Sequence, residues 1–332
     1  MTEIRERSDI CRLCDRARPL QASHVIPKFV YRFLSESSRG AGFRNPENIN
    51  LRIQDGPKRR WLCRDCERLL SGPERWFATN VFRPHLMDGA LATVGYDPHL
   101  YSFACGVMWR ALLLGRESGA IDKRATITAA IAEKILKETL RGWWQPIPFR
   151  VAMICSDYIP NVYELVGQTV PGWNRFLRRA TMVEFRVVDD ETYALVKLPG
   201  FCFVAELRQT RPVLQAFNID VMGGMAELTL GRQRTPVFIA LWLAGRSRES
   251  DAEFQAMSPR QKQLIDERQS RAYGTYDAPF DHAGASAFLD MLSEEGLRLE
   301  EVMERACFCG SQQTFGACHG INLRDRWAPG EA

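Results

Sequence analysis

Residues 62–67 read LCRDCE, and this stretch decides the N-terminal part of the fold. Its pair, Cys63 and Cys66, has a counterpart upstream in Cys11 and Cys14. A CxxC segment forms a tight turn that points two thiolates at one ion, and two such turns complete the four-thiolate shell that zinc prefers. The 48 residues between the pairs must then fold as an insert whose ends meet at the metal. The alternative is a redox pair or free thiols, although redox use normally needs one CxxC beside a βαβ pattern.

The overall composition is that of a globular protein. The chain has 332 residues, of which 45% are hydrophobic and 25% charged, and this excludes a wholly disordered or fibrous protein. Residues 1–10 are charged and lack the apolar segment of a signal peptide. The apolar stretch 101–115 is interrupted by Arg110 and is too short to span a bilayer. We therefore expect a cytoplasmic protein without a membrane segment, whose cysteines bind metal or fill the core.

Positive charge is concentrated in the first part of the chain. Residues 1–90 hold 17 Lys and Arg against 11 Asp and Glu, whereas the whole chain has a net charge of only +4. Most of the excess is arginine, which binds phosphate better than lysine does. This distribution is compatible with a nucleic-acid partner and equally with an ordinary solvated surface.

The texture of the sequence predicts an α+β fold in three parts. Residues 1–90 form a zinc-stapled ββα-like module, and residues 91–284 form a helical connector and a mostly antiparallel α+β body. Residues 285–332 form a helix and a small C-terminal zinc tail.

Hydrophobic periodicity places the helices and strands. Residues 101–115 predict a buried helix, and residues 126–144 predict an amphipathic helix with Ile127, Ile131, Ile135 and Leu140 at helical spacing. Further helices are expected at 162–170, 258–271 and 285–305, with loops at 244–256 and 272–284. Four or five antiparallel strands are expected among five segments: 148–156, 180–189, 191–198, 201–207 and 235–244. We expect Cys105, Cys155 and Cys202, together with most tryptophans of this region, to lie in the core.

A histidine motif accompanies the cysteine pairs. Residues 23–27 read SHVIP, and they follow the first CxxC just as LCRDCE surrounds the second. This order resembles the zinc-stapled branch of the HNH (ββα-metal) endonucleases over roughly residues 11–80. The resemblance implies that His24 is the general base that activates water against a phosphodiester, and that one Mg²⁺ or similar ion stabilises the leaving oxygen. The bland alternative is a strand histidine that only hydrogen-bonds within the module.

Two of the three signature positions of that family are altered. Ser23 stands in place of the metal-binding acid before the base, and Glu67 stands in place of the last metal-binding histidine. The family's asparagine falls near Lys58, so that Asn50, farther upstream, is the candidate for its role. Glu67 can still hold Mg²⁺ through oxygen. Asp55 and Glu74 are candidates to assist it, or these acids are plain surface charge.

The same segment is similar to a group of uncharacterised bacterial proteins that pair SHxIP with LCxxCE, and this second likeness implies no activity. In it, residues 55–57 (DGP) predict a turn between two strands. Arg52 and residues 58–60 form a basic turn that is suited to a phosphate backbone or is ordinary loop charge.

The C-terminal cysteines form a separate set. Cys307, Cys309, Cys318 and His319 follow a CxC…CH pattern that closely resembles the SEC-C zinc motif. Three thiolates and one imidazole make a closed tetrahedral zinc site with no open position for chemistry. The resemblance implies docking of a protein partner, and capping of the last helix is the alternative.

These features give two hypotheses for function. The first is an HNH-like metal-dependent nuclease that acts on DNA or RNA, with His24 as general base and Asn50 and Glu67 in the site. The second is a catalytically inactive zinc protein that binds nucleic acid or a protein partner. Both predict two structural zinc ions per chain, and the first adds Mg²⁺.

Overall fold

The computed structural model describes most of the first 274 residues. The described ranges are 10–38, 43–45, 48–88, 93–142, 147–156, 170–208, 227–230 and 235–274, with the single residues 159, 214, 303, 304, 314 and 317. The predicted helices at 162–170 and 285–305 therefore lie wholly or almost wholly outside the described residues. The C-terminal set Cys307, Cys309, Cys318 and His319 lies outside them as well.

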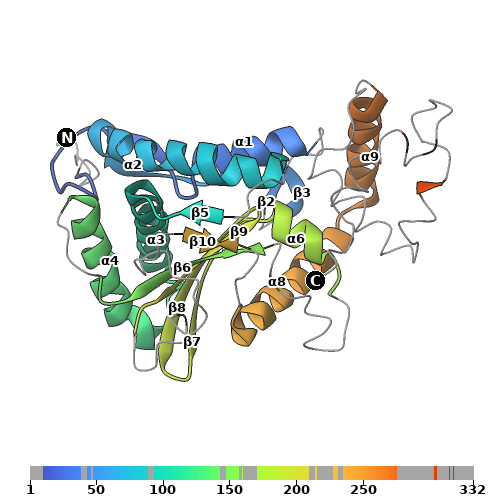
Figure 1. Ribbon diagram of the computed structural model, residues 1–332. Helices are drawn as coiled ribbons and strands as arrows, with labels where there is room; N and C mark the ends of the chain where they lie inside the picture. Colours follow the sequence, from blue (N-terminus) through green and yellow to red (C-terminus); the bar gives the residue numbers. More distant parts are fainter. Residues whose placement is uncertain are drawn as a thin grey trace, which may run out of the picture.

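The described elements alternate helices with short strands (Figure 1). In chain order they are β1 (Leu20–His24), α1 (Lys28–Ser37), β2 (Phe43–Asn45), β3 (Asn48–Ile53), β4 (Lys58–Cys63), α2 (Arg64–Phe77), η2 (Ala78–Phe82), η3 (Pro84–Asp88), β5 (Thr93–Gly95), α3 (Pro98–Ser118), η4 (Lys123–Ala125), α4 (Thr126–Leu140), β6 (Arg150–Cys155), α6 (Trp173–Arg179), β7 (Met182–Val188), β8 (Glu191–Leu198), β9 (Phe201–Glu206), β10 (Glu227–Thr229), α8 (Val237–Gln255) and α9 (Pro259–Gly274).

The body is built on one antiparallel sheet with the strand order β6-β9-β8-β7. Every residue of the central strands β8 and β9 is buried, because the sheet is covered on both faces. Alternate side chains enter two different hydrophobic clusters: Val196 and Phe203 face the first, and Leu195 and Val204 face the second. Helix α3 contacts the sheet on the first face, and α6 and α8 pack on the second. The α+β fold and four of the predicted antiparallel strands are confirmed.

The first hydrophobic cluster is continuous from the cysteine region to the sheet. It contains Cys11 and Leu62 near the N-terminus, Phe103 of α3 and Phe201 of β9. Stacked rings strengthen this junction, since Phe77 of α2 lies face to face with Phe103 at 4.0 Å between ring centroids. The N-terminal region is thus packed directly on the body, while the division at residues 90 and 284 stays a prediction.

The prediction for residues 235–244 was wrong. This segment is the start of helix α8, which runs on to Gln255 and so also replaces the loop expected at 244–256. Its buried side chains recur at Ile239, Ala240, Leu243 and Ala244, a helical spacing that the richness in β-branched and aromatic residues obscured. Pro236 directly precedes the helix, where a missing N–H costs nothing.

Helix α4 follows the predicted spacing only in part: Leu140 is buried and Ile135 packs against the core as predicted, but the first two isoleucines do not. Ile127 and Ile131 are 75% and 55% exposed, whereas Ala129, Ala132 and Leu136 are buried. The small alanines allow α4 to lie close against α3, so packing selects the alanine stripe over the more hydrophobic one.

The remaining core predictions hold where the structure describes them. The helix predicted at 101–115 is α3, and the helix predicted at 258–271 is α9. Cys105, Cys155, Cys202, Trp109 and Trp242 are buried. Among the helices in the described part of the chain, none is long and apolar enough to cross a membrane.

A buried lysine connects the sheet to α6. The ammonium group of Lys197 on β8 is completely buried and donates hydrogen bonds to the backbone oxygens of Leu177 and Ala180, at 2.7 and 3.0 Å. These carbonyls belong to the C-terminal end of α6, which has no further helical partner for them. Burial lowers the pKa of Lys197 to about 8.

The depressed pKa of Lys197 predicts a pH-dependent stability. Between pH 8 and about 10.5 the unfolded state holds a proton that the folded state has released, so stability rises with pH. We expect the difference in unfolding free energy between wild type and Lys197→Met to increase over this range, by at most ~1.4 kcal/mol per pH unit. Urea unfolding from pH 7.5 to 10.5 measures it, and a flat difference would contradict the buried-charge assignment.

Candidate functional site

The four N-terminal cysteines meet at one point. Their Sγ atoms all lie within 4.8 Å of one another, although Cys14 and Cys63 are 49 positions apart. Cys11 and Cys14 come from the loop that precedes β1. Cys63 ends β4 and caps α2, and Cys66 lies in the first turn of α2. The cluster therefore joins the loop before β1 to the junction of β4 and α2, two segments that are distant in sequence.

The geometry of the cluster fits zinc. Zn–S bonds of about 2.3 Å place neighbouring sulfurs of a tetrahedron about 3.8 Å apart. The sulfurs of Cys14 and Cys63 are 3.9 Å apart, close to that edge and far beyond a disulfide. The amide of Cys63 donates a hydrogen bond to Sγ of Cys11 at 3.3 Å, which stabilises a thiolate. We conclude that the four cysteines can hold one zinc ion.

The protonation behaviour of the thiols also favours a cation. Burial raises the pKa of Cys11, but hydrogen bonds from the backbone amides of Cys14 and Cys63 offset it, so that its pKa falls to about 7. Burial and the three neighbouring thiols raise the pKa of Cys66. Four sulfurs at this distance cannot all ionise without a compensating positive charge, and a divalent metal supplies it.

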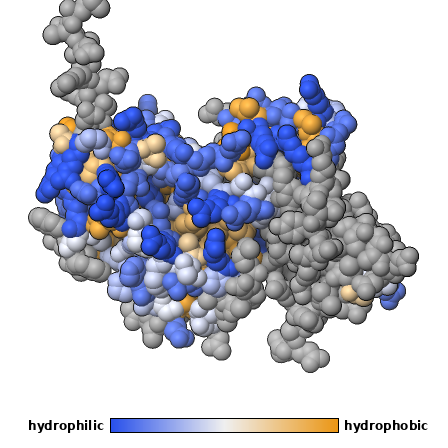
Figure 2. Space-filling model, turned by 90° about the horizontal axis from the view of Figure 1, so that it is seen from above, coloured by the Kyte–Doolittle hydropathy of each residue, from blue (hydrophilic) through white to orange (hydrophobic). Residues whose placement is uncertain are grey.

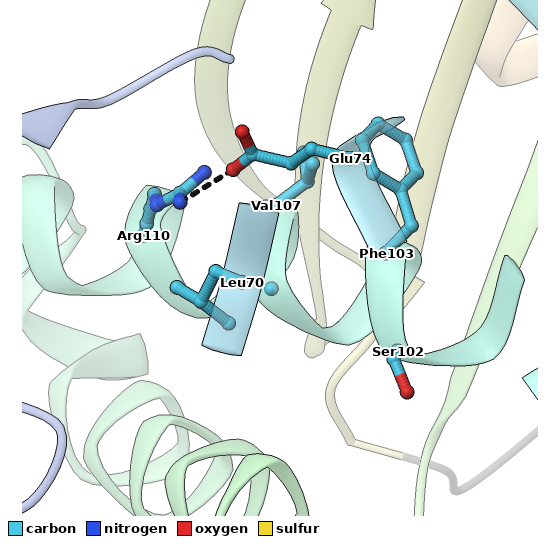
Figure 3. Close-up of a pocket in the computed structure, with 7 residues that line it drawn as sticks. Leu70, Glu74, Ser102, Phe103, Val107 and Arg110 are labelled. Carbon is cyan, nitrogen blue, oxygen red and sulfur yellow. Dashed lines mark hydrogen bonds and ion pairs between the residues drawn. The ribbon is translucent and has the colours of Figure 1, made fainter. Parts of the chain in front are cut away.

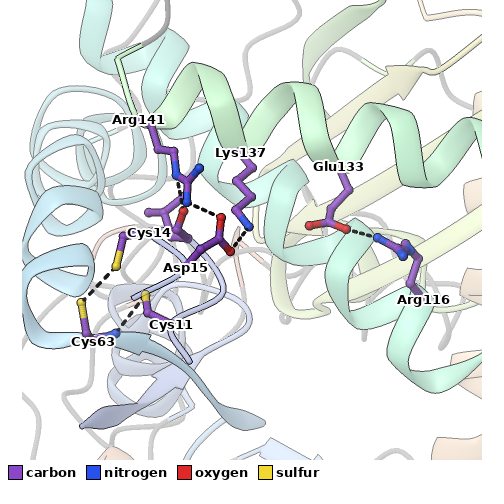
Figure 4. A network of polar contacts seen from close by, with 9 residues as sticks. Cys11, Cys14, Asp15, Cys63, Arg116, Glu133, Lys137 and Arg141 are labelled. Atoms are coloured by element: carbon purple, nitrogen blue, oxygen red, sulfur yellow. Dashed lines mark hydrogen bonds and ion pairs between the residues drawn. The ribbon is translucent and has the colours of Figure 1, made fainter. Parts of the chain in front are cut away.

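The first cysteine turn is fixed from outside by α4 (Figure 4). Asp15 has a left-handed backbone, with φ of 56°, and its carboxylate forms ion pairs with Lys137 and Arg141. Arg141 also donates to the backbone oxygen of Leu13, between the two cysteines. The end of α4 thus holds both the backbone and the charge of the turn.

The pairing of β1 with β4 places His24 relative to the cysteines. The strands are antiparallel, so Leu20 lies opposite Cys63 at one end and His24 opposite Lys58 at the other. Helix α2 follows β4 directly and contacts both strands. The described part of the module therefore contains two antiparallel strands and a helix, with the cysteines at one end of the strands and His24 at the opposite end.

His24 is held by a carboxylate. Its Nε2 lies 2.7 Å from Oδ1 of Asp55, and the histidine side chain retains 12% of its exposed surface. The ring of Tyr31, on α1, lies 5.8 Å away between centroids and closes one side of the imidazole. His24 is therefore oriented on two sides and still reachable from solvent.

Asp55 is itself strongly fixed. Lys58 pairs with its Oδ2 at 2.5 Å, and the amide of Gly56 donates to Oδ1 at 2.9 Å. Partial burial opposes ionisation, but these contacts and His24 together lower the pKa of Asp55 to about 2. Asp55 is thus a carboxylate at neutral pH, with protein groups on both of its oxygens.

Glu67 lies in the first turn of α2, next to Cys66. Its Oε1 is buried and accepts no hydrogen bond within the described part of the chain. A buried carboxylate oxygen without a donor is costly and is suited to a hard cation. Among the described residues, however, only the cysteines bring three or more ligand atoms together, so Glu67 does not share a ready three-residue cage with His24.

Asn50 is engaged elsewhere. It lies on β3, which pairs with β2 and not with the antiparallel pair of β1 and β4. Its side-chain oxygen accepts a hydrogen bond at 2.8 Å from the amide of Ser258, just before α9. This contact satisfies a free N–H at the start of a helix, and the catalytic role of Asn50 stays a prediction.

Glu74 is neutralised by a buried arginine (Figure 3). Helix α2 continues through Gly72 and Pro73, so Glu74 does lie on the same helix as Glu67. Its Oε1 pairs with Arg110 of α3 at 2.6 Å, and Arg110 is only 3% exposed. The hollow between the helices has no room for a water molecule. This arrangement indicates a structural ion pair for Glu74 and does not favour it as a metal ligand.

Exposed basic residues lie on β4 at the end of the strand that pairs with His24. Lys58, Arg59 and Arg60 are consecutive exposed residues of β4, and Lys58 pairs with Asp55. At the opposite end of the strand, beside Cys63, a hollow of about 220 Å³ is lined by Arg18, Arg64 and Asp65, and Arg18 pairs with Asp65 there. The face seen in Figure 2 is mainly hydrophilic and its hydrophobic patches are small and separate. The first three residues of β4 are thus an exposed run of positive charge.

Sequence reasoning missed two residues of the site. The sequence indicates Asp55 as a turn residue and a candidate metal ligand but not as a partner of His24, and it does not single out Asp15. Asp55 lies 31 positions from His24, and no spacing rule links a strand histidine to a carboxylate in a distant turn. The only available signal was the DGP turn, which showed where Asp55 lies but not what it contacts.

No protein-family model matches this chain, and no curated protein or solved structure matches it either.

Metal analysis tests the cluster. We expect purified protein to contain zinc, and Cys66→Ser to lose one equivalent per chain together with much of its stability, because a structural zinc contributes its binding energy to folding. Cys105→Ser, which alters a buried cysteine outside the cluster, should retain all zinc. Loss of a further equivalent in Cys309→Ser would test the C-terminal site. Equal zinc in wild type and Cys66→Ser would contradict the assignment.

Proposed function

We propose that the protein is a metal-dependent phosphodiesterase of HNH type that cleaves DNA or RNA, with His24 as general base. One observation carries the proposal: in the strand–strand–helix unit of β1, β4 and α2, His24 lies at one end of the paired strands and the four-cysteine cluster lies at the other. Its side chain is oriented by Asp55 and reachable from solvent, as a base that takes a proton from water must be.

The proposed chemistry is hydrolysis of a phosphodiester. His24 removes a proton from a water molecule while the water oxygen attacks phosphorus, and the bond from phosphorus to the leaving oxygen breaks. A Mg²⁺ ion at the site would stabilise the charge on that leaving oxygen. Glu67 is the residue best suited to bind it, because its buried Oε1 has no donor in the described structure. With few protein ligands, such an ion would keep several waters and phosphate oxygens.

A second candidate is a catalytically inactive protein that binds nucleic acid. Ser23 occupies the position of the family's metal-binding acid, and it is only 2% exposed, so it points into the module. The consecutive basic residues Lys58, Arg59 and Arg60 favour contact with a phosphate backbone even without cleavage. Docking of a protein partner by the C-terminal cysteine set is a further proposal, which rests on its SEC-C-like spacing.

Cleavage assays separate the two candidates. Full-length protein is incubated with supercoiled plasmid or structured RNA in Mg²⁺, Mn²⁺ or EDTA. We expect metal-dependent cutting that falls by about 10²-fold or more in His24→Ala, since a general base contributes roughly this much. His99→Ala changes an exposed histidine on α3 and should cut normally. Cutting that survives in His24→Ala would exclude His24 as the base, and absence of cutting by folded, zinc-loaded protein would favour the binding candidate.

Binding assays test the basic strand under either candidate. Fluorescence anisotropy in EDTA with labelled nucleic acid should show affinity that falls steeply with salt. The double variant Arg59→Ala/Arg60→Ala should bind more weakly, and its slope of log K against log salt should be shallower by about 1 for each phosphate that the variant no longer neutralises. Arg260→Ala, an exposed residue at the start of α9, is the matched control. If the double variant bound like wild type, this surface would not be where nucleic acid binds.

A further inference from the structure

We infer that Asp55 is a positioning residue for His24: it fixes the imidazole in the tautomer with hydrogen on Nε2 and leaves Nδ1 as the nitrogen that accepts a proton. The consequence for catalysis rests on the proposed function. The assignment of the tautomer does not, because it follows from the contacts of the two side chains alone.

The first step concerns what Asp55 can do chemically. An ionised carboxylate only accepts hydrogen bonds, so a nitrogen 2.7 Å from its Oδ1 must carry the hydrogen. Lys58 at 2.5 Å from Oδ2 and the amide of Gly56 at 2.9 Å from Oδ1 both favour the charged form. Neutral His24 is therefore protonated on Nε2, and its lone pair lies on Nδ1.

The second step concerns the rigidity of the turn that carries Asp55. A Cβ atom at Gly56 would lie 1.9 Å from Cζ of Tyr31, so this position packs flat against the buried ring and admits only glycine. The amide of Val25, next to His24, donates to the backbone oxygen of Pro57 at 3.1 Å. The two residues that follow Asp55 are therefore fixed, Gly56 against the Tyr31 ring of α1 and Pro57 to the backbone just after β1. Lys58 and the amide of Gly56 hold the carboxylate itself beside the imidazole.

The third step concerns the free side of the ring. Nδ1 of His24 has no protein partner within the described part of the chain, whereas Nε2 is occupied by Asp55. The ring is partly exposed, so a water molecule can reach Nδ1. The same contacts argue against Asp55 as a metal ligand, because Lys58 and His24 already occupy both oxygens.

The experiment is ¹⁵N NMR of the histidine side chains in full-length protein across a pH series, without Mg²⁺. The long-range ¹H–¹⁵N pattern identifies the tautomer of each neutral imidazole, and His24→Ala assigns the signal. We expect His24 to show hydrogen on Nε2 in wild type. Asp55→Asn should shift it toward the other tautomer, because Lys58 only donates and so takes the amide oxygen, which turns the amide NH2 toward Nε2. Asp97→Asn is the matched control: Asp97 makes the analogous contact with Nδ1 of His99 at 2.8 Å, so its replacement should leave the tautomer of His24 unchanged.

The outcomes are distinguishable from those of the cleavage assay. Hydrogen on Nδ1 in wild type, or a tautomer that Asp55→Asn leaves unchanged, would overturn the inference even if the protein cuts nucleic acid. A tautomer set by Asp55 in a protein that cuts nothing would support the inference and overturn the nuclease proposal. If both hold, kcat of Asp55→Asn should fall by about 10²-fold with little change in KM, as expected for an impaired general base.

Discussion

Convergence of two CxxC turns on one point is the constraint on which the N-terminal half of the structure depends. The pairing of β1 with β4 places Leu20 opposite Cys63, and so brings the loop that holds Cys11 and Cys14 beside the start of α2, where the four sulfurs lie within 4.8 Å of one another. Helix α2 begins directly after Cys63 and packs on the paired strands β1 and β4. A zinc ion bound by the four cysteines would crosslink the two CxxC turns and contribute its binding energy to the fold of this region.

The unit of β1, β4 and α2 also packs on the rest of the protein. Asp15 binds the end of α4, and Glu74 binds the buried guanidinium of Arg110 on α3. Apolar contacts continue from Leu62 through Phe77 and Phe103 to the sheet. The position of His24 is therefore set by the whole body and not by the cysteines alone.

The polar residues at the His24 end of the paired strands β1 and β4 hold one another in sequence. Lys58 keeps Asp55 ionised, Asp55 orients His24, and Tyr31 together with Gly56 prevents the turn from moving. Glu67 differs from these residues because one of its oxygens is buried without a donor in the described structure. The described residues thus include one acid, Asp55, whose two oxygens both have protein partners, and another, Glu67, with a buried oxygen that accepts no hydrogen bond from them.

The sequence by itself determined the α+β class, the four-cysteine set, the strands β6 to β9 and the buried helix α3, because these depend on local spacing and on periodicity that repeats over several residues. It could not distinguish strand from helix at 235–244, where apolar richness fits both, nor choose between the isoleucine and alanine faces of α4. The cysteines could be grouped in advance because their chemistry has one common solution. Only the tertiary structure decided that Asp55 binds His24, that Asn50 binds the segment before α9 and that Glu74 belongs to Arg110. Those partners lie 31, 208 and 36 positions apart, and contacts at such separations are selected by the packing of whole elements, which no local pattern encodes.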